Sequence, residues 1–112
     1  MKALGPEGEE AAVKYLKARG FKILHRNYKT PLGEADIVAL DKDTTVFVEV
    51  KARSSSRFGE PFEAVDSRKQ ERLRRIALFY QKRAGAESAI RFDVISIKDG
   101  SERTIDHIEG AF

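Results

Sequence analysis

The 112-residue chain contains no cysteine, which excludes a disulfide framework and any thiolate metal site. A metal ion would therefore need oxygen ligands or one of the two histidines, and oxygen ligands favour a hard ion such as Mg²⁺ or Mn²⁺. Long hydrophobic runs are also missing, and residues 1–6 lack the apolar stretch of a signal peptide. We therefore expect a cytoplasmic protein.

The chain also lacks internal repeats, low-complexity tracts and linker-like segments. Its length suits a single domain covering residues 1–112, with one core that needs no disulfides. Hydrophobic residues make up 41% and charged residues 35% of the chain, which excludes a disordered or membrane-embedded chain. The composition thus predicts an ordinary globular domain.

The most informative stretch runs from Gly33 to Lys51, where two β-rich runs flank a short polar turn at residues 41–44. This pattern predicts a β-hairpin. A turn centred between positions 42 and 43 places Asp36 opposite Glu49 and Glu34 opposite Lys51.

Alternation along the two arms of this hairpin separates an apolar face from a mixed one. The apolar face is expected in the core and carries Ala35, Ile37, Ala39, Val46, Val48 and Val50. The other face is apolar near the turn, with Val38, Leu40 and Phe47, and charged at its open end. The charged end is therefore the candidate site.

Asp36 and Glu49 are predicted to lie on directly opposed positions, where Cβ atoms are about 4.5–5.5 Å apart. Two carboxylates this close repel each other unless a cation lies between them or one keeps its proton. One interpretation is a divalent ion held by Asp36 and Glu49, with Lys51 beside it. The other is a solvated charge cluster with a weak ion pair between Glu34 and Lys51. The apolar surface two residues away favours the first.

A helix is predicted from Gly5-Pro6 to Arg19-Gly20, because proline suits a first helical turn and glycine a helix end. Glu9 lies one turn before Ala12 and two turns before Leu16 on the same stripe. This carboxylate at the edge of a packed face either contributes to the site or only complements the helix dipole.

Positive charge follows the carboxylate pair along the chain. The formal net charge is +3, and residues 51–75 hold eight basic side chains against four acidic ones. A polyanion, most often nucleic acid, is the natural partner of such a region, although a solvated helix face is the alternative. Arg53 and Arg57 flank a serine-rich stretch before Gly59, and such loops can clamp a phosphate backbone.

A second helix is predicted to begin near Ser67, since Ser67 to Gln70 matches the Ser-x-x-Gln capping box. Lys69 and Gln70 point from its first turn toward the sheet, and Arg72 adds a further positive charge. The helix N-terminus, Lys69 and Gln70 could together bind an anion. Alternatively, Gln70 serves only the cap, and Lys69 lies along apolar surface.

Three further strands are predicted at Phe21–Tyr28, Ala89–Lys98 and Arg103–Ile108, with a turn at Asp99-Gly100 between the last two. Asp93 lies inside an apolar strand, where it either supports the site or pairs with a nearby arginine; we favour the arginine. His25 is expected at the surface rather than at a metal.

Asp36, followed by Glu49-Val50-Lys51 on the next strand, resembles the acidic, Glu-x-Lys core of the PD-(D/E)xK nucleases. This superfamily includes many restriction endonucleases and archaeal-type Holliday junction resolvases. More specifically, the chain resembles the YraN family of small bacterial proteins that are predicted nucleases. The segments that carry this resemblance are Gly8-Glu9, Arg26 to Tyr28, Gly33 to Asp36, Val46 to Arg53, Val65 to Arg72 and Arg91 to Val94.

The resemblance implies an α/β domain of the restriction endonuclease-like type, with a mixed central β-sheet flanked by helices. It implies a divalent-metal site on Asp36, Glu49 and the carbonyl of Val50, with Glu9 as an additional acidic residue and Lys51 as the catalytic lysine. The expected activity is metal-dependent hydrolysis of DNA phosphodiesters, with branched or damaged DNA among the candidate substrates. The alternative is a nucleic-acid-binding module that keeps the fold without cleaving. A homodimer would allow two strands to be cut, but no sequence feature requires it.

Overall fold

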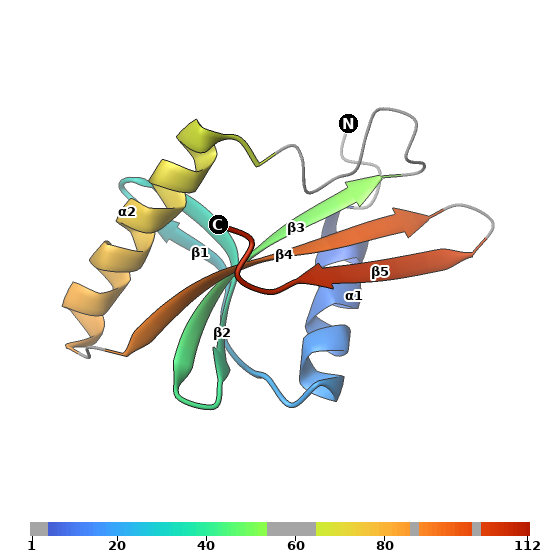
Figure 1. Ribbon diagram of the computed structural model, residues 1–112, viewed down its shortest axis with the longest axis horizontal. Helices are drawn as coiled ribbons and strands as arrows, with labels where there is room; N and C mark the ends of the chain where they lie inside the picture. Colours follow the sequence, from blue (N-terminus) through green and yellow to red (C-terminus); the bar gives the residue numbers. More distant parts are fainter. Residues whose placement is uncertain (1–4, 54–64, 86–87, 100–101) are drawn as a thin grey trace.

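The computed structural model describes residues 5–53, 65–85, 88–99 and 102–112 (Figure 1). Its elements in chain order are α1 (Gly5–Ala18), β1 (Lys22–Thr30), β2 (Gly33–Asp41), β3 (Thr44–Arg53), α2 (Ser67–Ala84), β4 (Ala89–Asp99) and β5 (Arg103–Ile108). Within these ranges no helix combines the length and the apolar character needed to cross a bilayer. All the predicted elements are therefore present, although the predicted Asp99-Gly100 turn lies partly outside the described residues.

The sheet contains five strands in the order β1-β2-β3-β4-β5. Neighbouring strands are antiparallel except β3 and β4, which are parallel. A parallel pair needs a long crossover, and the connection that contains α2 provides it. The predicted mixed sheet flanked by helices is confirmed, and the arrangement is consistent with a restriction endonuclease-like fold.

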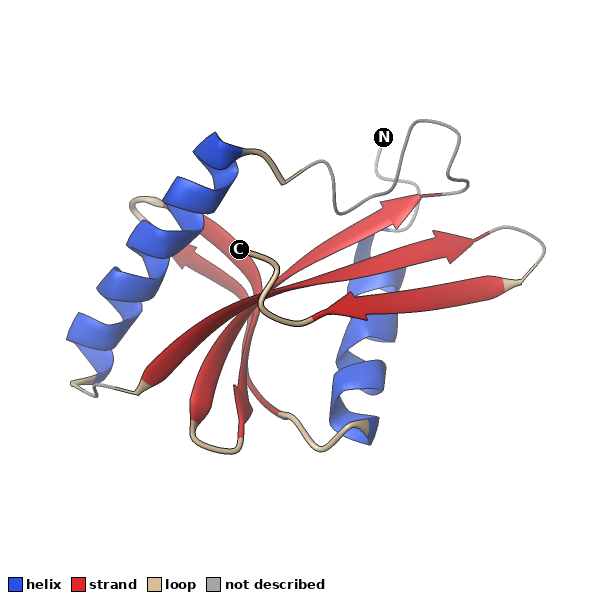
Figure 2. Ribbon diagram, viewed as in Figure 1, coloured by secondary structure: helices blue, strands red, loops and turns tan. Residues whose placement is uncertain are grey.

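The two helices cover opposite faces of the sheet (Figure 2). Ala12, Val13 and Leu16 of α1 pack on one face against a cluster with Ile37, Ala39, Val46, Val48, Ile95 and Ile97. Leu73, Ile76 and Ala77 of α2 pack on the other face against a cluster with Ala35, Val38 and Phe47. The central strands are therefore buried on both sides.

The register predicted for the β2–β3 hairpin is confirmed for the part next to the turn. Asp41 pairs with Thr44, and the paired positions continue to Ile37 and Val48. Lys42 in the turn has a φ of 57°, in the left-handed region that tight hairpin turns require. The predicted alignment therefore holds near the turn but stops one position short of Asp36 and Glu49, on which the site prediction depended.

The prediction for Ala35 is wrong. Ala35 and Ile37 were expected on one face, yet Ala35 packs in the α2 cluster and Ile37 in the α1 cluster. The β1–β2 pairing joins Tyr28 to Ala35 and Arg26 to Ile37 but omits the positions between them, and Asn27 has a φ of 52°. The regular alternation is thus interrupted at Asp36, where the backbone departs from the ideal strand that the prediction assumed.

The second helix begins at the predicted Ser67, but its N-cap is Asp66. The Asp66 carboxylate accepts a hydrogen bond of 2.9 Å from the backbone N–H of Lys69. The Ser67 capping box is therefore wrong by one residue, because Asp66 is an equally good cap and its negative charge also complements the helix N-terminus. The cap fixes the start of the first turn, which contains Lys69.

Candidate metal and nucleic-acid site

Glu49 lies in the middle of the candidate site. It belongs to β3, and only 5% of its side chain is exposed. Its Oε2 contacts Nζ of Lys69 from α2 and lies 3.4 Å from Nζ of Lys51. The predicted direction of Lys69, from the first turn of α2 toward the charged end of the hairpin, is therefore confirmed.

Asp36 contacts β3, but not through the predicted pairing with Glu49. The paired positions of β2 and β3 end at Ile37 and Val48, so Asp36 and Glu49 do not form the next paired position. Instead, Oδ2 of Asp36 accepts a hydrogen bond of 2.9 Å from the N–H of Val50. A side-chain oxygen thus takes the place of a backbone acceptor where the two strands separate.

The carboxyl group of Asp36 has a pKa raised from 3.8 to about 6. Burial is the main cause, because it disfavours the charged form, and the negative charge of Glu49 is the next. Glu9 of α1 adds a smaller rise, which the hydrogen bond from Val50 and the charge of Lys69 oppose. Glu49 of β3 and Glu9 of α1 therefore both disfavour the ionised form of Asp36 on β2.

The two lysines respond in opposite directions. Burial and the neighbouring Lys69 lower the pKa of Lys51, against the charge of Glu49. Burial also disfavours the charge on Lys69, but its hydrogen bonds, to Glu49 first, raise the pKa of Lys69 overall. Two amines thus share one buried carboxylate, and only Lys69 has its pKa raised overall.

The other predicted nucleic-acid contacts are less well placed. Gln70 donates a hydrogen bond of 3.0 Å to the carbonyl of Val65, so its amide stabilises the entry into α2, as in the capping alternative. Arg72 is exposed, and its stem lies so close to Gly33 that a Cβ there would be 2.8 Å from Cδ. The side chain of Arg53 and all of Arg57 lie outside the described residues. Their predicted roles remain predictions.

The fit of a metal ion depends on the oxygen donors. In the described part of the chain, no group of three or more histidine, aspartate and glutamate side chains is gathered closely enough to hold an ion. Asp36, Glu49 and the carbonyl of Val50 would therefore need water or substrate oxygens to complete a coordination shell. Mg²⁺ is commonly bound in this way, by one or two carboxylates with several retained waters. Burial and the charge of Glu49 raise the pKa of Asp36, and a bound cation would favour its ionised form.

Comparisons with known proteins place the chain in a family. The model of the uncharacterised protein family UPF0102 matches residues 8–97. The chain belongs to UPF0102. This confirms the resemblance to YraN, which is a name for the same family.

Relatives in this family match almost the whole chain. A UPF0102 protein of Thermodesulfovibrio yellowstonii is 47% identical over 97% of this chain and 95% of its own. A second, from Moorella thermoacetica, is 48% identical over 96% and 93%, and a third, from Nocardia farcinica, is 43% identical over 98% and 89%. The UPF0102 chain is therefore similar in extent to its relatives.

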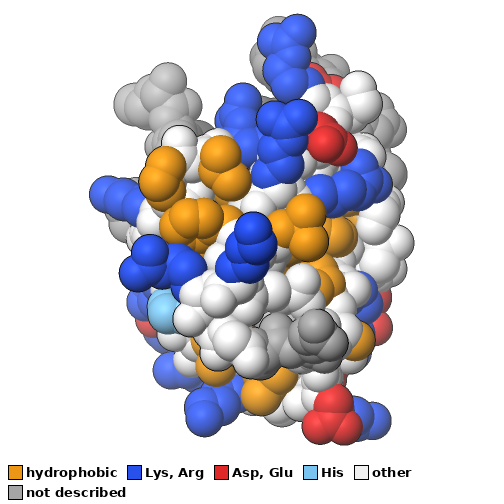
Figure 3. Space-filling view, turned by 90° about the vertical axis from the view of Figure 1, so that its left-hand side faces the viewer, with side chains coloured by type: hydrophobic (Ala, Val, Ile, Leu, Met, Phe, Trp, Pro, Cys, Tyr) orange, Lys and Arg blue, Asp and Glu red, His pale blue; other side chains and the backbone are white. Residues whose placement is uncertain are grey.

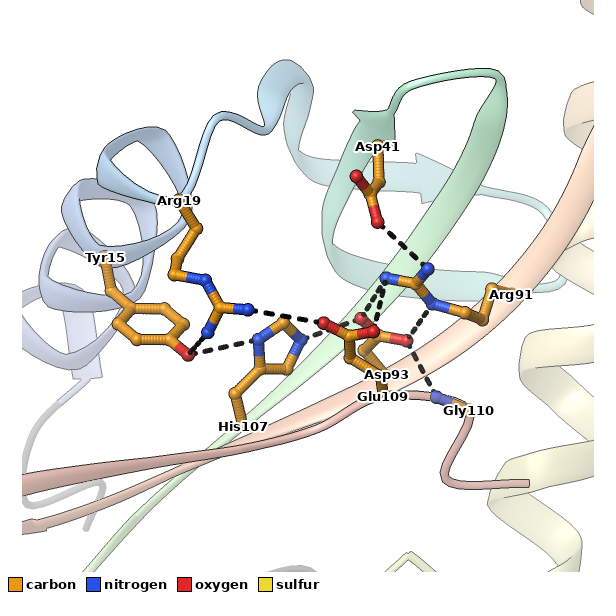
Figure 4. Close-up of polar contacts among 8 residues, drawn as sticks. All are labelled: Tyr15, Arg19, Asp41, Arg91, Asp93, His107, Glu109 and Gly110. Carbon is orange, nitrogen blue, oxygen red and sulfur yellow. Dashed lines mark hydrogen bonds and ion pairs between the residues drawn. The ribbon is translucent and has the colours of Figure 1, made fainter.

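A second charged cluster of the UPF0102 chain lies around Asp93, which is fully buried (Figure 4). Arg91 donates to both carboxylate oxygens, at 2.8 and 2.9 Å, and the N–H of Gly110 donates at 3.1 Å. Nε2 of His107 lies 2.7 Å from Oδ2. The preferred prediction, that Asp93 pairs with an arginine, is confirmed.

The remaining members of this Asp93 cluster come from distant segments. The hydroxyl of Tyr15 on α1 lies 3.3 Å from Nδ1 of His107 and accepts a hydrogen bond of 2.7 Å from Arg19. Arg91 also donates to Asp41 at 3.0 Å. The sequence analysis missed His107 and Tyr15, and the only local signals were the Tyr15–Arg19 spacing of one helical turn and the Arg91–Asp93 spacing along one strand. The cluster ties α1, β2, β4, β5 and the segment after β5 together.

Proposed function

We propose that this chain is a metal-dependent nuclease that hydrolyses phosphodiester bonds of DNA. The observation that carries the proposal is that an acid with a raised pKa and two lysines converge on one buried carboxylate. Asp36 has a pKa raised to about 6, beside the buried Glu49, which both Lys51 and Lys69 approach. Perturbed titratable groups that converge from three separate elements are typical of catalytic sites.

In this proposal Asp36, Glu49 and the carbonyl of Val50 hold a Mg²⁺ or Mn²⁺ ion. Bound there, the ion would polarise the phosphoryl group and lower the pKa of a coordinated water. Glu9 would add to the negative charge that attracts the cation, since its charge already raises the pKa of Asp36. The absence of cysteine and the oxygen-rich donor set are consistent with such a hard ion.

The two lysines would have different tasks. Lys69, whose pKa is raised, keeps its positive charge and would stabilise negative charge on the non-bridging phosphate oxygens. Lys51, whose pKa is lowered by burial and by Lys69, would be unprotonated more often than an ordinary lysine, and in that form it would orient the attacking water and take its proton. This division supports a hydrolytic reaction better than two equivalent ammonium groups would.

DNA would approach over the N-terminal part of α2. The helix contains seven basic side chains and one acidic one, and Lys69 lies in its first turn. Arg68 and Arg72 are exposed beside this end and would contact phosphate oxygens. Such contacts would position a strand without reading its sequence.

One observation favours the alternative of a module that binds without cleaving. Lys69 already contacts Glu49, so its ammonium neutralises a carboxylate that the metal ion would need. Among the described residues, no three acidic or histidine side chains lie close enough together to hold an ion. Both observations would suit a site that attracts phosphate through lysine alone.

The test is cleavage of single-stranded, duplex and four-way-junction DNA with Mg²⁺, Mn²⁺ or EDTA, together with binding measured across a range of salt concentrations. Glu49→Gln removes the central carboxylate charge and keeps the side-chain shape. Asp43→Asn is the matched control, because Asp43 is an exposed acid in the turn at the other end of the same hairpin.

Metal-dependent cleavage that Glu49→Gln abolishes and Asp43→Asn retains would establish the nuclease. Salt-sensitive binding without cleavage under any metal condition would establish the non-cleaving module. If neither cleavage nor binding occurs with any of the three DNA forms, the proposal is rejected.

A further inference from the structure

Away from the candidate site, a groove runs along the outer side of the C-terminal half of α2. It has a volume of about 690 Å³ and lies between α2 and the β1–β2 turn. Its apolar lining consists of Leu32 from that turn with Leu78 and Phe79 from α2, and Arg75 and Lys82 supply the charge. None of the described residues that line it is acidic.

Leu32 and Leu78 are the two exposed large apolar side chains in the described ranges, with 46% and 63% of their surfaces accessible. Isolated exposed leucines are common, but here both line the same groove. Figure 3 looks onto the side of the molecule that carries α2 and shows apolar side chains interspersed with lysine and arginine, with little acidic surface. The groove therefore offers a ligand both apolar surface and positive charge.

We infer that this groove binds an acidic peptide segment of a partner protein, one with at least one large apolar side chain among aspartates or glutamates. The apolar side chain would pack against Leu32, Leu78 and Phe79. The flanking carboxylates would pair with Arg75 and Lys82. This is the usual composition of a peptide interface, with an apolar centre and a charged rim.

Charge complementarity selects an acidic partner. Arg75 and Lys82 line the groove, and Arg74 and Arg83 of the same helix are also exposed. The only acidic residue of α2 is Glu71, which pairs with Arg75 at 3.5 Å at one end of the groove. A surface with this imbalance attracts negative charge and repels basic segments.

The apolar lining favours a peptide over nucleic acid. Bases are bound by stacking on aromatic rings or arginine, and leucine offers no flat surface for stacking. The ring of Phe79, the one aromatic lining residue among those described, already carries the guanidinium of Arg83 at 5.5 Å from its centre. Leu78 also lies about 13 Å along the helix from Lys69, so the groove is separate from the proposed catalytic site.

The experiment begins with a phage-displayed library of random 12-residue peptides, selected on the immobilised full chain. Peptides that the wild type recovers would be synthesised with a fluorescein label, and their affinity measured by fluorescence anisotropy. The variants are Leu78→Asp, which replaces the most exposed apolar contact with a repelling charge, and Arg75→Gln. The charge control is Lys17→Glu, at an exposed position on α1.

We expect the selected peptides to be rich in acidic residues around a leucine, isoleucine or phenylalanine. Leu78→Asp should weaken their binding at least about tenfold, which corresponds to roughly 1.4 kcal/mol. Arg75→Gln should weaken it less, and Lys17→Glu should leave it unchanged. All three variants should keep the wild-type circular dichroism spectrum, because the altered side chains are exposed.

Three results would overturn the inference. The first is a selection that recovers no acidic, apolar-anchored peptide, or one whose peptides bind Leu78→Asp as tightly as the wild type. The second is complete displacement of the peptides by a 12-base-pair DNA duplex whose own binding Leu78→Asp weakens equally, which would assign the groove to nucleic acid. The third is self-association in sedimentation that Leu78→Asp abolishes, which would assign it to a second copy of the chain.

Discussion

Asp36 and Asp93 are aspartates of the same sheet, and their surroundings affect them in opposite ways. Asp93 is surrounded by donors: Arg91 binds both of its oxygens, and His107 and Gly110 add to them. Asp36 receives one backbone hydrogen bond and lies near two other carboxyl groups. A buried carboxylate whose oxygens all accept hydrogen bonds is typical of a structural role. A buried carboxylate close to other carboxylates is typical of a site that binds or reacts.

Their pKa values express this difference. Burial alone would raise the pKa of Asp93, but the hydrogen bonds from His107, Arg91 and Gly110 lower it overall. Burial, Glu49 and Glu9 raise that of Asp36 to about 6. The comparison predicts that mutations at the two positions have opposite effects on stability.

The largest effect is expected from Asp93→Asn. The substitution leaves Arg91 without its buried carboxylate, and removing one partner of a buried ion pair costs about 3–5 kcal/mol. We expect a loss of about 3 kcal/mol in the free energy of unfolding, measured by urea denaturation at pH 7. Asp43→Asn, in the exposed turn, is the control and should change stability by less than about 0.5 kcal/mol. A loss below about 1 kcal/mol for Asp93→Asn would show that Asp93 does not have the structural role assigned to it.

Asp36→Asn should stabilise the chain at pH 8 in EDTA. The folded protein then no longer holds an ionised carboxylate in a place that disfavours it, and an amide oxygen can still accept the N–H of Val50. A pKa raised from 3.8 to about 6 corresponds to about 2 kcal/mol after allowance for partial exposure, so we expect a gain of that order. Urea denaturation measures it, and a loss of stability would show that Asp36 is a structural acid like Asp93.

The pH dependence should separate the two residues further. The folded pKa of Asp36 lies above its unfolded value of 3.8, so its ionisation opposes folding above about pH 6 and the penalty disappears as the pH falls toward 3.8. The advantage of Asp36→Asn should therefore shrink between pH 7 and pH 4.

The folded pKa of Asp93 lies below 3.8, so its stabilising contribution is complete above that value and is lost as the pH falls through the folded pKa. The deficit of Asp93→Asn should thus persist from pH 7 to about pH 4 and shrink only below it. Unfolding curves of the three proteins at five pH values would test both trends. If the stability deficit of Asp93→Asn and the stability gain of Asp36→Asn changed over the same pH range, the opposite pKa shifts assigned to the two residues would be contradicted.

The smallest effect is expected on the pKa of Asp36 itself. Glu49→Gln removes the second cause of its rise, so the pKa should move down toward 3.8 yet remain above it, because burial is the larger cause. Glu9→Gln should lower it less, since Glu9 is the smaller of the two neighbouring charges in its effect. Carbon-13 NMR titration of the aspartate carboxyl groups would measure both shifts. An unchanged value in Glu49→Gln would mean that the two acids do not interact.

Much of the fold could be predicted because it depends on local patterns. The hairpin register follows from the turn at residues 41–44 and from period-two alternation, and it holds from Asp41–Thr44 to Ile37–Val48. The alternation failed at Ala35, where the β1–β2 pairing is irregular and Asn27 adopts a left-handed conformation. No single strand pattern signals such an irregularity, because it depends on the partner strand.

The sequence indicated which charged residues lie near the candidate site better than it indicated how their charges affect one another. Glu49 affects the pKa values of Asp36, Lys51 and Lys69, and Glu9 affects that of Asp36, but the sequence could not rank the two lysines. Their ranking depends on how Lys69 of α2 and Lys51 of β3 share Glu49. The groove on α2 was also not predicted, because it requires Leu32 of a distant turn beside Leu78.

The amino-acid sequence by itself determined the strands, the hairpin alignment and the set of charged residues near it, since these follow from backbone periodicity and turn chemistry over short distances. Only the tertiary structure decided that Asp36 is buried beside other carboxyl groups, whereas Asp93 is surrounded by hydrogen-bond donors. The physical reason is that the stability of a buried charge depends on the donors and charges around it. For these two acids, the decisive neighbours come from segments as far apart as α1, α2 and β5.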